Sequence, residues 1–173
     1  MKKIISLFFF ICISFSQKYN HFEGNVSYYG SHPLHDWKGM STSINGEIIY
    51  EAISKNYRCL IEVPVESFKS KNGNRDSNML IYANALEHPK ILFKSTNINI
   101  ESGFAKITGM MKFAGKEKEI ISNAKVEIND EIIVEGDFII NLSDFDIKRP
   151  SLMFLKIDDQ IKIEYKMNVK NKK

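Results

Sequence analysis

The stretch Ile161-Lys162-Ile163-Glu164-Tyr165-Lys166-Met167-Asn168-Val169-Lys170 decides the fold class of this chain. Its apolar side chains alternate strictly with charged or amide side chains. Because successive side chains of a β-strand point to opposite faces, this period of two marks one buried face and one face in water. One wet face per strand is typical of antiparallel sheets. The stretch therefore predicts a half-buried antiparallel strand.

The same alternation recurs along most of the chain and predicts further strands. Turn-like residues separate the apolar sets near residues 101–103, 115–116 and 129–130. The residues expected to point inward are Tyr57, Cys59, Ile61, Val63 and Val65; Ile91, Phe93 and Ser95; Ala105, Ile107, Gly109, Met111 and Phe113; Ile120, Ser122, Ala124, Val126 and Ile128; and Ile132, Val134, Gly136, Phe138, Ile140 and Leu142.

Strands are also expected nearer the N-terminus. Alternation over residues 22–28 predicts a first strand. The pair Asn45-Gly46 is typical of a two-residue hairpin turn, so strands are predicted over residues 38–44 and 47–53. The total is about eight antiparallel strands, which fits a closed barrel whose interior holds side chains or one small ligand.

One short helix is predicted over residues 74–86. Asn74 provides a residue type that caps helix N-termini, and Pro89 ends the pattern. No repeat, low-complexity block or linker rich in Gly, Pro or Ser follows, so we expect one all-β domain that includes this helix. The apolar residues at helical spacing are Met79, Tyr82, Ala83 and Leu86.

The first sixteen residues have the layout of a secretory signal peptide. Lys2 and Lys3 precede a short apolar run, and Ser14 and Ser16 place small side chains before a cleavage site between Ser16 and Gln17. The run is shorter than the roughly 20 apolar residues of a membrane-spanning helix, and no later segment approaches that length. We therefore expect an exported chain without a stable membrane span.

Removal of residues 1–16 leaves one domain over residues 17–173, located in the periplasm or secreted. Cys59 is then its only cysteine, so no intrachain disulfide can form. A lipid anchor on Cys12 is not favoured, because a large residue, Ile11, precedes it. The formal net charge of +3 falls to +1 without the two leader lysines, and no nucleic-acid-binding pattern is present.

Residues that could carry catalysis or bind a metal do not converge in the sequence. The histidine pair His32 and His35 has a spacing that could grip an ion, but a zinc site normally needs three or four ligands. No Gly-x-Ser-x-Gly nucleophile turn occurs. Aspartate pairs at 144/146 and 158/159 flank strand ends, where Asp favours turns. We expect no catalytic residue, no metal and no cofactor.

The phenylalanines allow two interpretations. Phe93, Phe113 and Phe138 fall on inward faces, where they either fill a packed core or line a lumen that holds an apolar molecule. Small inward residues remove volume from the middle of the interior and favour the lumen. These small residues are Ser95, Ala105, Gly109, Ser122, Ala124 and Gly136.

Six short stretches form a recognisable series: LHDWKG at 34–39, VPVESF at 63–68, RDSNM at 75–79, HPKILFKS at 88–95, ITG at 107–109 and GDFII at 136–140. In order and spacing they resemble the landmarks of the YceI-like family over residues 19–169. The resemblance implies an eight-stranded, lipocalin-like antiparallel barrel that is exported to the periplasm or beyond and binds a long isoprenoid or similar amphiphile. No catalytic activity is established for the family as a whole.

Two groups of site residues follow from the pattern and the resemblance together. At the barrel mouth, the resemblance places Arg75 and Asp76 at the start of the short helix, with a role in capping and pairing. His35 and Trp37 follow a turn, and Trp37 either plugs one end of the barrel or stacks on a ligand headgroup. The residues expected to line the lumen are Ile61, Met79, Phe93, Met111, Phe113 and Phe138.

Two functions compete at this stage. The first is a carrier or sequestering protein whose partner is an apolar lipid such as a polyisoprenoid or a quinone. The second is an interaction or stress-response module of the cell envelope, with a fully packed barrel and no ligand. Alternation fits both, and it leaves the oligomeric state open, a homodimer included.

Overall fold

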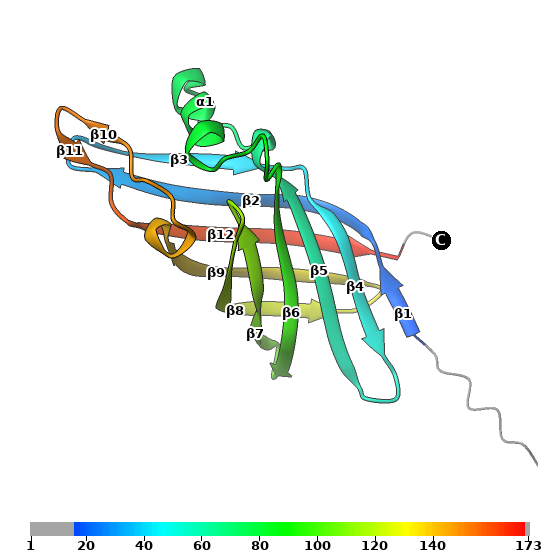
Figure 1. Cartoon of the computed structure of the whole chain (residues 1–173). Coiled ribbons are helices and arrows are strands. Elements are labelled where there is room, and N and C mark those ends of the chain that lie inside the picture. The colour runs from blue at the N-terminus through cyan, green and yellow to red at the C-terminus, as the bar shows by residue number, and fades with distance from the viewer. Residues whose placement is uncertain (1–15, 172–173) are drawn as a thin grey trace, which may run out of the picture.

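The computed structural model describes residues 16–171, so the expected leader lies outside the described residues except for Ser16. Ten strands form one antiparallel sheet in the order β1-β4-β5-β6-β7-β8-β9-β12-β2-β3 (Figure 1). These strands are β1 (Ser16–Tyr19), β2 (His21–His32), β3 (His35–Ser41), β4 (Asn45–Glu51), β5 (Asn56–Pro64), β6 (Lys90–Glu101), β7 (Phe104–Phe113), β8 (Lys116–Ile128), β9 (Glu131–Asn141) and β12 (Gln160–Lys170).

Smaller elements lie at one end of this sheet. The helix α1 (Gly73–Tyr82) follows the 3-10 turn η1 (Val65–Ser67), and a second 3-10 turn, η2 (Leu142–Phe145), follows β9. The hairpin of β10 (Ser151–Leu152) and β11 (Leu155–Lys156) projects beyond the sheet (Figure 1). Among the described residues, no helix is long and apolar enough to cross a membrane.

The alternation that predicted the sheet is confirmed in β12. Its inward residues Ile161, Ile163, Met167 and Val169 are buried. The lysines on its outer face form ion pairs with acids on the same or neighbouring strands, which keeps this face in water. These pairs are Lys162 with Asp137 at 3.2 Å and Glu164 at 2.8 Å, Lys166 with Glu135 at 3.2 Å and Lys170 with Glu23 at 3.0 Å.

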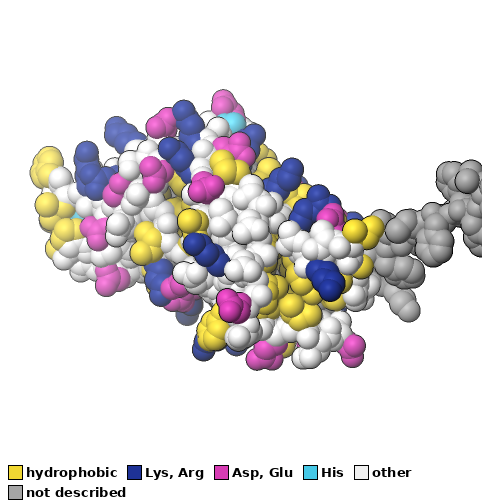
Figure 2. Space-filling view, turned by 90° about the horizontal axis from the view of Figure 1, so that it is seen from below, with side chains coloured by type: hydrophobic (Ala, Val, Ile, Leu, Met, Phe, Trp, Pro, Cys, Tyr) yellow, Lys and Arg dark blue, Asp and Glu magenta, His cyan; other side chains and the backbone are white. Residues whose placement is uncertain are grey.

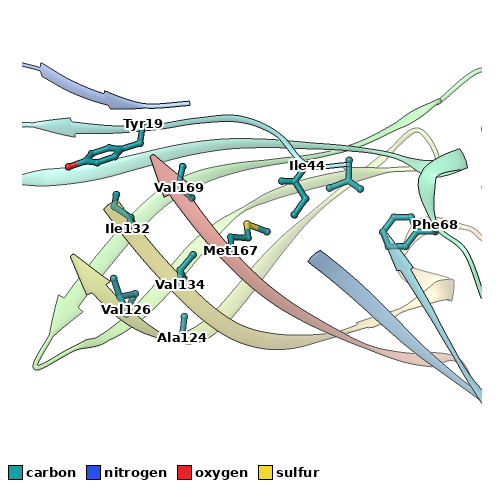
Figure 3. Packing of buried hydrophobic residues seen from close by; sticks show 11 residues of the cluster. Tyr19, Ile44, Phe68, Ala124, Val126, Ile132, Val134, Met167 and Val169 are labelled. Carbon is teal, nitrogen blue, oxygen red and sulfur yellow. The ribbon is translucent and has the colours of Figure 1, made fainter. Parts of the chain in front are cut away.

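The inward side chains form a packed cluster at the end of the sheet opposite the β10–β11 hairpin. Tyr19 and Val169 are almost completely buried there, and Ile132 and Val126 lie beside them (Figure 3). Farther along the interior, Phe68 packs against Tyr28 with a ring-centroid distance of 5.7 Å. Residues from β1, β8, β9 and β12 therefore contribute to one common core at this end.

The all-β antiparallel fold with one helix agrees with the prediction, but the count of eight strands is corrected. The main sheet has ten strands: β1 at one edge was not predicted, and β3 at the other edge begins and ends earlier than the strand predicted over residues 38–44. The two edge strands do not pair with each other, so the described strands do not close into the predicted barrel. The strands on either side of Asn45-Gly46 do not form the predicted hairpin. Gly46 lies inside β4, which pairs with β1 and β5, whereas β3 pairs with β2.

Gly46 serves a close approach of two backbones. Its φ of +140° is rare for residues with a side chain, and a Cβ at this position would lie 2.0 Å from the Leu60 carbonyl oxygen. We expect Gly46→Ala to lower the free energy of unfolding by about 2 kcal/mol or more. Gly73→Ala is the matched control, because a Cβ there meets nothing within 4 Å. Urea unfolding of both variants checks this, and equal stabilities would contradict it.

The helix begins and ends earlier than predicted. Asn72, not Asn74, caps it, and its side chain accepts a hydrogen bond of 3.1 Å from the Arg75 N–H. Asn84 ends it with a φ of +49°. The Asn84 and Ala85 N–H groups donate to the carbonyls of Ile81 and Leu80, which is the Schellman pattern. Leu86 consequently lies outside the helix and Pro89 does not terminate it.

Candidate ligand-binding lumen

The sheet and the helix enclose two adjoining chambers. An inner chamber of about 160 Å³ lies among strands β4 to β9, β2 and β12. An outer chamber of about 380 Å³ lies beneath α1, β3 and the segment after η2. Both chambers are lined by Phe68, Ile91, Met111 and Ile163, so these four residues form the junction between them.

The inner chamber presents an apolar wall. Two of its polar side chains are hydrogen-bonded: the Ser122 hydroxyl donates to the backbone carbonyl of Asp137 at 2.8 Å, so the Tyr165 hydroxyl donates to Ser122 at 2.8 Å. Burial raises the pKa of Tyr165, which keeps the phenol neutral. The chamber therefore offers contacts to alkyl or isoprenoid carbon and few polar groups for a headgroup.

Three strand glycines lie beneath aromatic side chains from neighbouring strands. Gly109 and Gly136 were expected to leave empty space, but aromatic rings lie directly on them. A Cβ on Gly109 would be 2.5 Å from the Phe93 ring, and a Cβ on Gly136 would be 2.6 Å from the Tyr165 hydroxyl. Trp37 covers Gly30 in the same way, at 2.3 Å. The absence of a side chain at each glycine thus makes room for an aromatic side chain from a neighbouring strand.

A polar cluster lies at the wall of the outer chamber. The Arg75 guanidinium lies 5.1 Å above the ring of Trp37, a cation–π geometry. Arg75 Nη2 lies 3.4 Å from His35 Nε2, and the rings of His35 and Trp37 are 5.7 Å apart. Because His35 is exposed and Trp37 is half-buried, the cluster joins the chamber to the solvent. Trp37 thus forms part of the wall.

Asp76 does not line either chamber. Its carboxylate accepts hydrogen bonds from the Ser70 N–H at 2.9 Å and the Ser70 hydroxyl at 2.6 Å. These bonds fix the loop that leads into α1. Asp76 is therefore a structural residue beside the mouth, whereas its neighbour Arg75 lines the outer chamber.

The six predicted lumen residues all lie at the walls. Ile61, Phe93 and Phe138 line the inner chamber, Met79 and Phe113 line the outer one, and Met111 lies at the junction. Sequence reasoning missed other wall residues that inward alternation could have indicated, such as Tyr28 and Ile161. It also missed residues of the segment after η2, for which alternation gives no signal: Ile147, Pro150, Ser151, Leu152 and Ile157.

The wall of the inner chamber has a seam between β5 and β6. These strands pair only from Leu60 to Pro64, and they diverge beyond that point (Figure 1). A register shift in β6 between Ser95 and Asn97 accompanies the divergence. The Cys59 N–H, which lies just beyond the paired stretch, donates to the Ser95 hydroxyl at 2.8 Å.

Cys59 lies at this seam and provides a probe of the inner chamber. Burial raises the pKa of its thiol, so the reactive thiolate is scarce at neutral pH and increases as the pH rises. We expect slow alkylation by a neutral maleimide at pH 7, faster alkylation at pH 9, and protection when an apolar ligand fills the chamber. Mass spectrometry of the labelled protein measures these rates. Alkylation as fast as that of free cysteine would contradict the placement.

The histidines have structural contacts. His32 is buried, its Nδ1 accepts from the Leu34 N–H at 3.2 Å, and its Nε2 lies 3.1 Å from the Leu155 carbonyl oxygen. Both ring nitrogens are therefore used within the protein. Over residues 16–171, no group of three or more His, Cys, Asp or Glu side chains is arranged to hold a metal ion.

Comparisons with known proteins agree with this architecture. Solved structures with the same fold include BcnA of Burkholderia cenocepacia (TM-score 0.74, 15% identity, 84% of this chain and 95% of that chain covered). A polyisoprenoid binding domain from Saccharophagus degradans has a TM-score of 0.74 at 11% identity, with 90% and 98% covered. The Campylobacter jejuni YCEI protein has a TM-score of 0.67 at 18% identity, with 78% and 85% covered.

The family comparison covers nearly the whole described chain. No curated protein matches the sequence significantly. The model of the YceI-like domain, however, matches residues 18–169, which include every strand of the main sheet except part of β1 and β12. The chain therefore belongs to the YceI-like domain family.

Proposed function

We propose that this protein is an exported carrier or sequestering protein that holds an apolar chain, such as a polyisoprenoid or a quinone tail, in its lumen. The observation that supports this most strongly is the pair of adjoining chambers with apolar walls. The Saccharophagus degradans relative, a polyisoprenoid binding domain, supports the choice of ligand class. Burial of apolar surface at about 25 cal/mol per Å² would supply most of the affinity.

The proposed site has two parts with different roles. Ile61, Phe93 and Phe138 would contact the distal part of the chain, because they line the inner chamber. Met79 and Phe113 would contact its proximal part in the outer chamber. His35, Trp37 and Arg75 would lie nearest the polar end of the ligand, because they carry the donors at the mouth.

The alternative of an envelope interaction module predicts a fully packed barrel. Chambers of about 160 and 380 Å³ disfavour it, because protein interiors have few voids larger than a water molecule. We also propose that the protein is not an enzyme, since the Ser122 and Tyr165 hydroxyls of the inner chamber are hydrogen-bonded to each other and burial raises the pKa of the Cys59 thiol.

Native mass spectrometry of the purified protein, followed by organic extraction, tests the proposal. We expect a stoichiometric apolar amphiphile that organic solvent removes and that rebinds to the stripped protein. A mass of the protein alone, with no uptake of added polyprenyl lipid or quinone, would refute the carrier function. Expression of the full chain in a bacterium, with fractionation and N-terminal sequencing, tests export, for which we expect a mature chain that starts at Gln17.

A further inference from the structure

The β10–β11 hairpin carries an apolar tip with no cover among the described residues. Phe154 is fully exposed, and Met153 is 73% exposed. Leu152 and Leu155 flank them, and Leu34 on the neighbouring β2–β3 turn is also exposed. We call these five residues the apolar tip. Figure 2 shows hydrophobic side chains at the end of the molecule where Figure 1 places this hairpin.

The turn itself does not require large apolar residues. Met153 and Phe154 have φ values of +50° and +67°, the backbone of a type I′ turn, which disfavours bulky side chains. The chain forms two other two-residue turns with positive φ at both positions, at Ser102-Gly103 and Ala114-Gly115. Both use small residues and end in glycine. The bulky pair therefore strains the turn and serves something other than its geometry.

The tip lies at the mouth of the outer chamber. Leu152 and the preceding Ser151 line that chamber, together with His35 and Arg75. The contact of His32 Nε2 with the Leu155 carbonyl, at 3.1 Å, joins the hairpin to the β2–β3 turn that carries Leu34. An object that binds the tip would therefore lie next to the entrance of the lumen.

The charges around the tip favour an anionic surface. The segment from Lys148 to Lys156 contains three basic residues and no acidic one. Lys156 is the first charged residue behind the tip in the hairpin ladder. Among the acids nearest in sequence, Asp158 lies two residues beyond Lys156, and Asp36 lies two residues beyond Leu34. Asp36 accepts a hydrogen bond from the Ser31 hydroxyl, and Asp159 accepts one from the Ser143 N–H. Protruding apolar side chains followed by lysine or arginine are suited to the interface of a bilayer with anionic lipids.

We propose that the apolar tip docks this protein on anionic phospholipid membranes, with the mouth of the outer chamber facing the lipid. Phe154 and Met153 insert among the acyl chains near the surface, and Lys148, Arg149 and Lys156 lie at the headgroups. This docking is distinct from ligand binding in the lumen, because the two inserting residues, Met153 and Phe154, line neither chamber. An empty carrier docks as well as a loaded one.

Flotation with vesicles tests docking. We expect the full mature chain to float with vesicles of phosphatidylcholine and phosphatidylglycerol, weakly with phosphatidylcholine alone, and less at high salt. The double variant Met153→Ser with Phe154→Gly copies the Ser102-Gly103 turn, so it folds at least as stably. It is expected to reduce vesicle affinity by about 10-fold or more. Leu86→Ser, which removes a fully exposed leucine outside the tip, is the control and retains binding.

Each contrary outcome is distinguishable. No flotation of the unmodified protein, or equal flotation of the double variant, would overturn the docking proposal and leave lumen binding unaffected. Met111→Trp, which narrows the lumen, is expected to float with vesicles as well as the unmodified protein does. Loss of flotation in this variant alone would mean that vesicles bind through lipid captured in the lumen. If the double variant floats as the unmodified protein does but no longer self-associates in sedimentation experiments, the tip is a contact between copies of the chain instead.

Discussion

Replacing Met111 with Trp is expected to reduce the affinity for long apolar chains by about 100-fold. Met111 is buried and lines both chambers, so a larger ring at this position closes the junction between them. A ligand long enough to occupy both chambers of the unmodified protein would then be excluded from the inner chamber. Each methylene excluded costs about 0.8 kcal/mol, so three or four methylenes amount to about 3 kcal/mol, which is roughly 100-fold in affinity.

Chain length provides the internal control for this variant. Ligands short enough for the outer chamber alone should bind Met111→Trp nearly as well as the unmodified protein, and Met111→Leu should bind both classes, because it conserves volume. Titration with prenyl alcohols of increasing length measures the affinity of each variant for short and long chains. Quenching of Trp37 fluorescence reports binding to Met111→Leu, and calorimetry reports binding to Met111→Trp. Equal losses for short and long chains would show that the two chambers do not act as one lumen.

The largest expected effect on stability is that of Phe145→Ala. Phe145 is 1% exposed, and its ring centroid lies 5.6 Å from that of Phe113. Removing the ring leaves a cavity beside the outer chamber, and such truncations cost about 3–5 kcal/mol. Phe104→Ala is the matched control, because Phe104 is 60% exposed at the β6–β7 turn and should cost less than about 1 kcal/mol.

Urea unfolding of both variants checks this prediction. A loss for Phe145→Ala no greater than that for Phe104→Ala would mean that η2 contributes little to the fold. Phe145→Ala should also weaken ligand binding, since Phe113 would lose the aromatic ring that packs against it. Binding that survives with full affinity would separate the stability of η2 from the shape of the lumen.

The sequence predicted the strands because alternation reports directly on burial. In β12, each inward position is apolar and each outward position is polar, so the order of residues alone assigns the face toward the core. The same reasoning placed Ile61, Phe93 and Phe138 on the inner wall. It failed at Asn45-Gly46, because a dipeptide typical of turns also suits a close approach of strands, and only the position of the Leu60 carbonyl distinguishes the two.

Local hydrogen bonds determine where the helix ends, and the spacing of its apolar residues did not predict this position. Apolar residues at helical spacing continue to Leu86, but the Schellman bonds at Asn84 end the helix at Tyr82. The sequence contains the signal, since asparagine at this position is a recognised helix stop. Capping chemistry therefore outweighs hydrophobic spacing at this helix end.

The sequence by itself determined the antiparallel all-β class, the inward faces and the family, because each depends on local alternation or on the order of short motifs. Only the tertiary structure decided whether the interior is empty, where the two chambers meet and which end carries the mouth. These depend on distances between side chains far apart in the chain, such as the Phe93 ring over Gly109 or the Arg75 guanidinium over Trp37. Alternation specifies which face is buried; the volume left inside is set by how rings from different strands pack together.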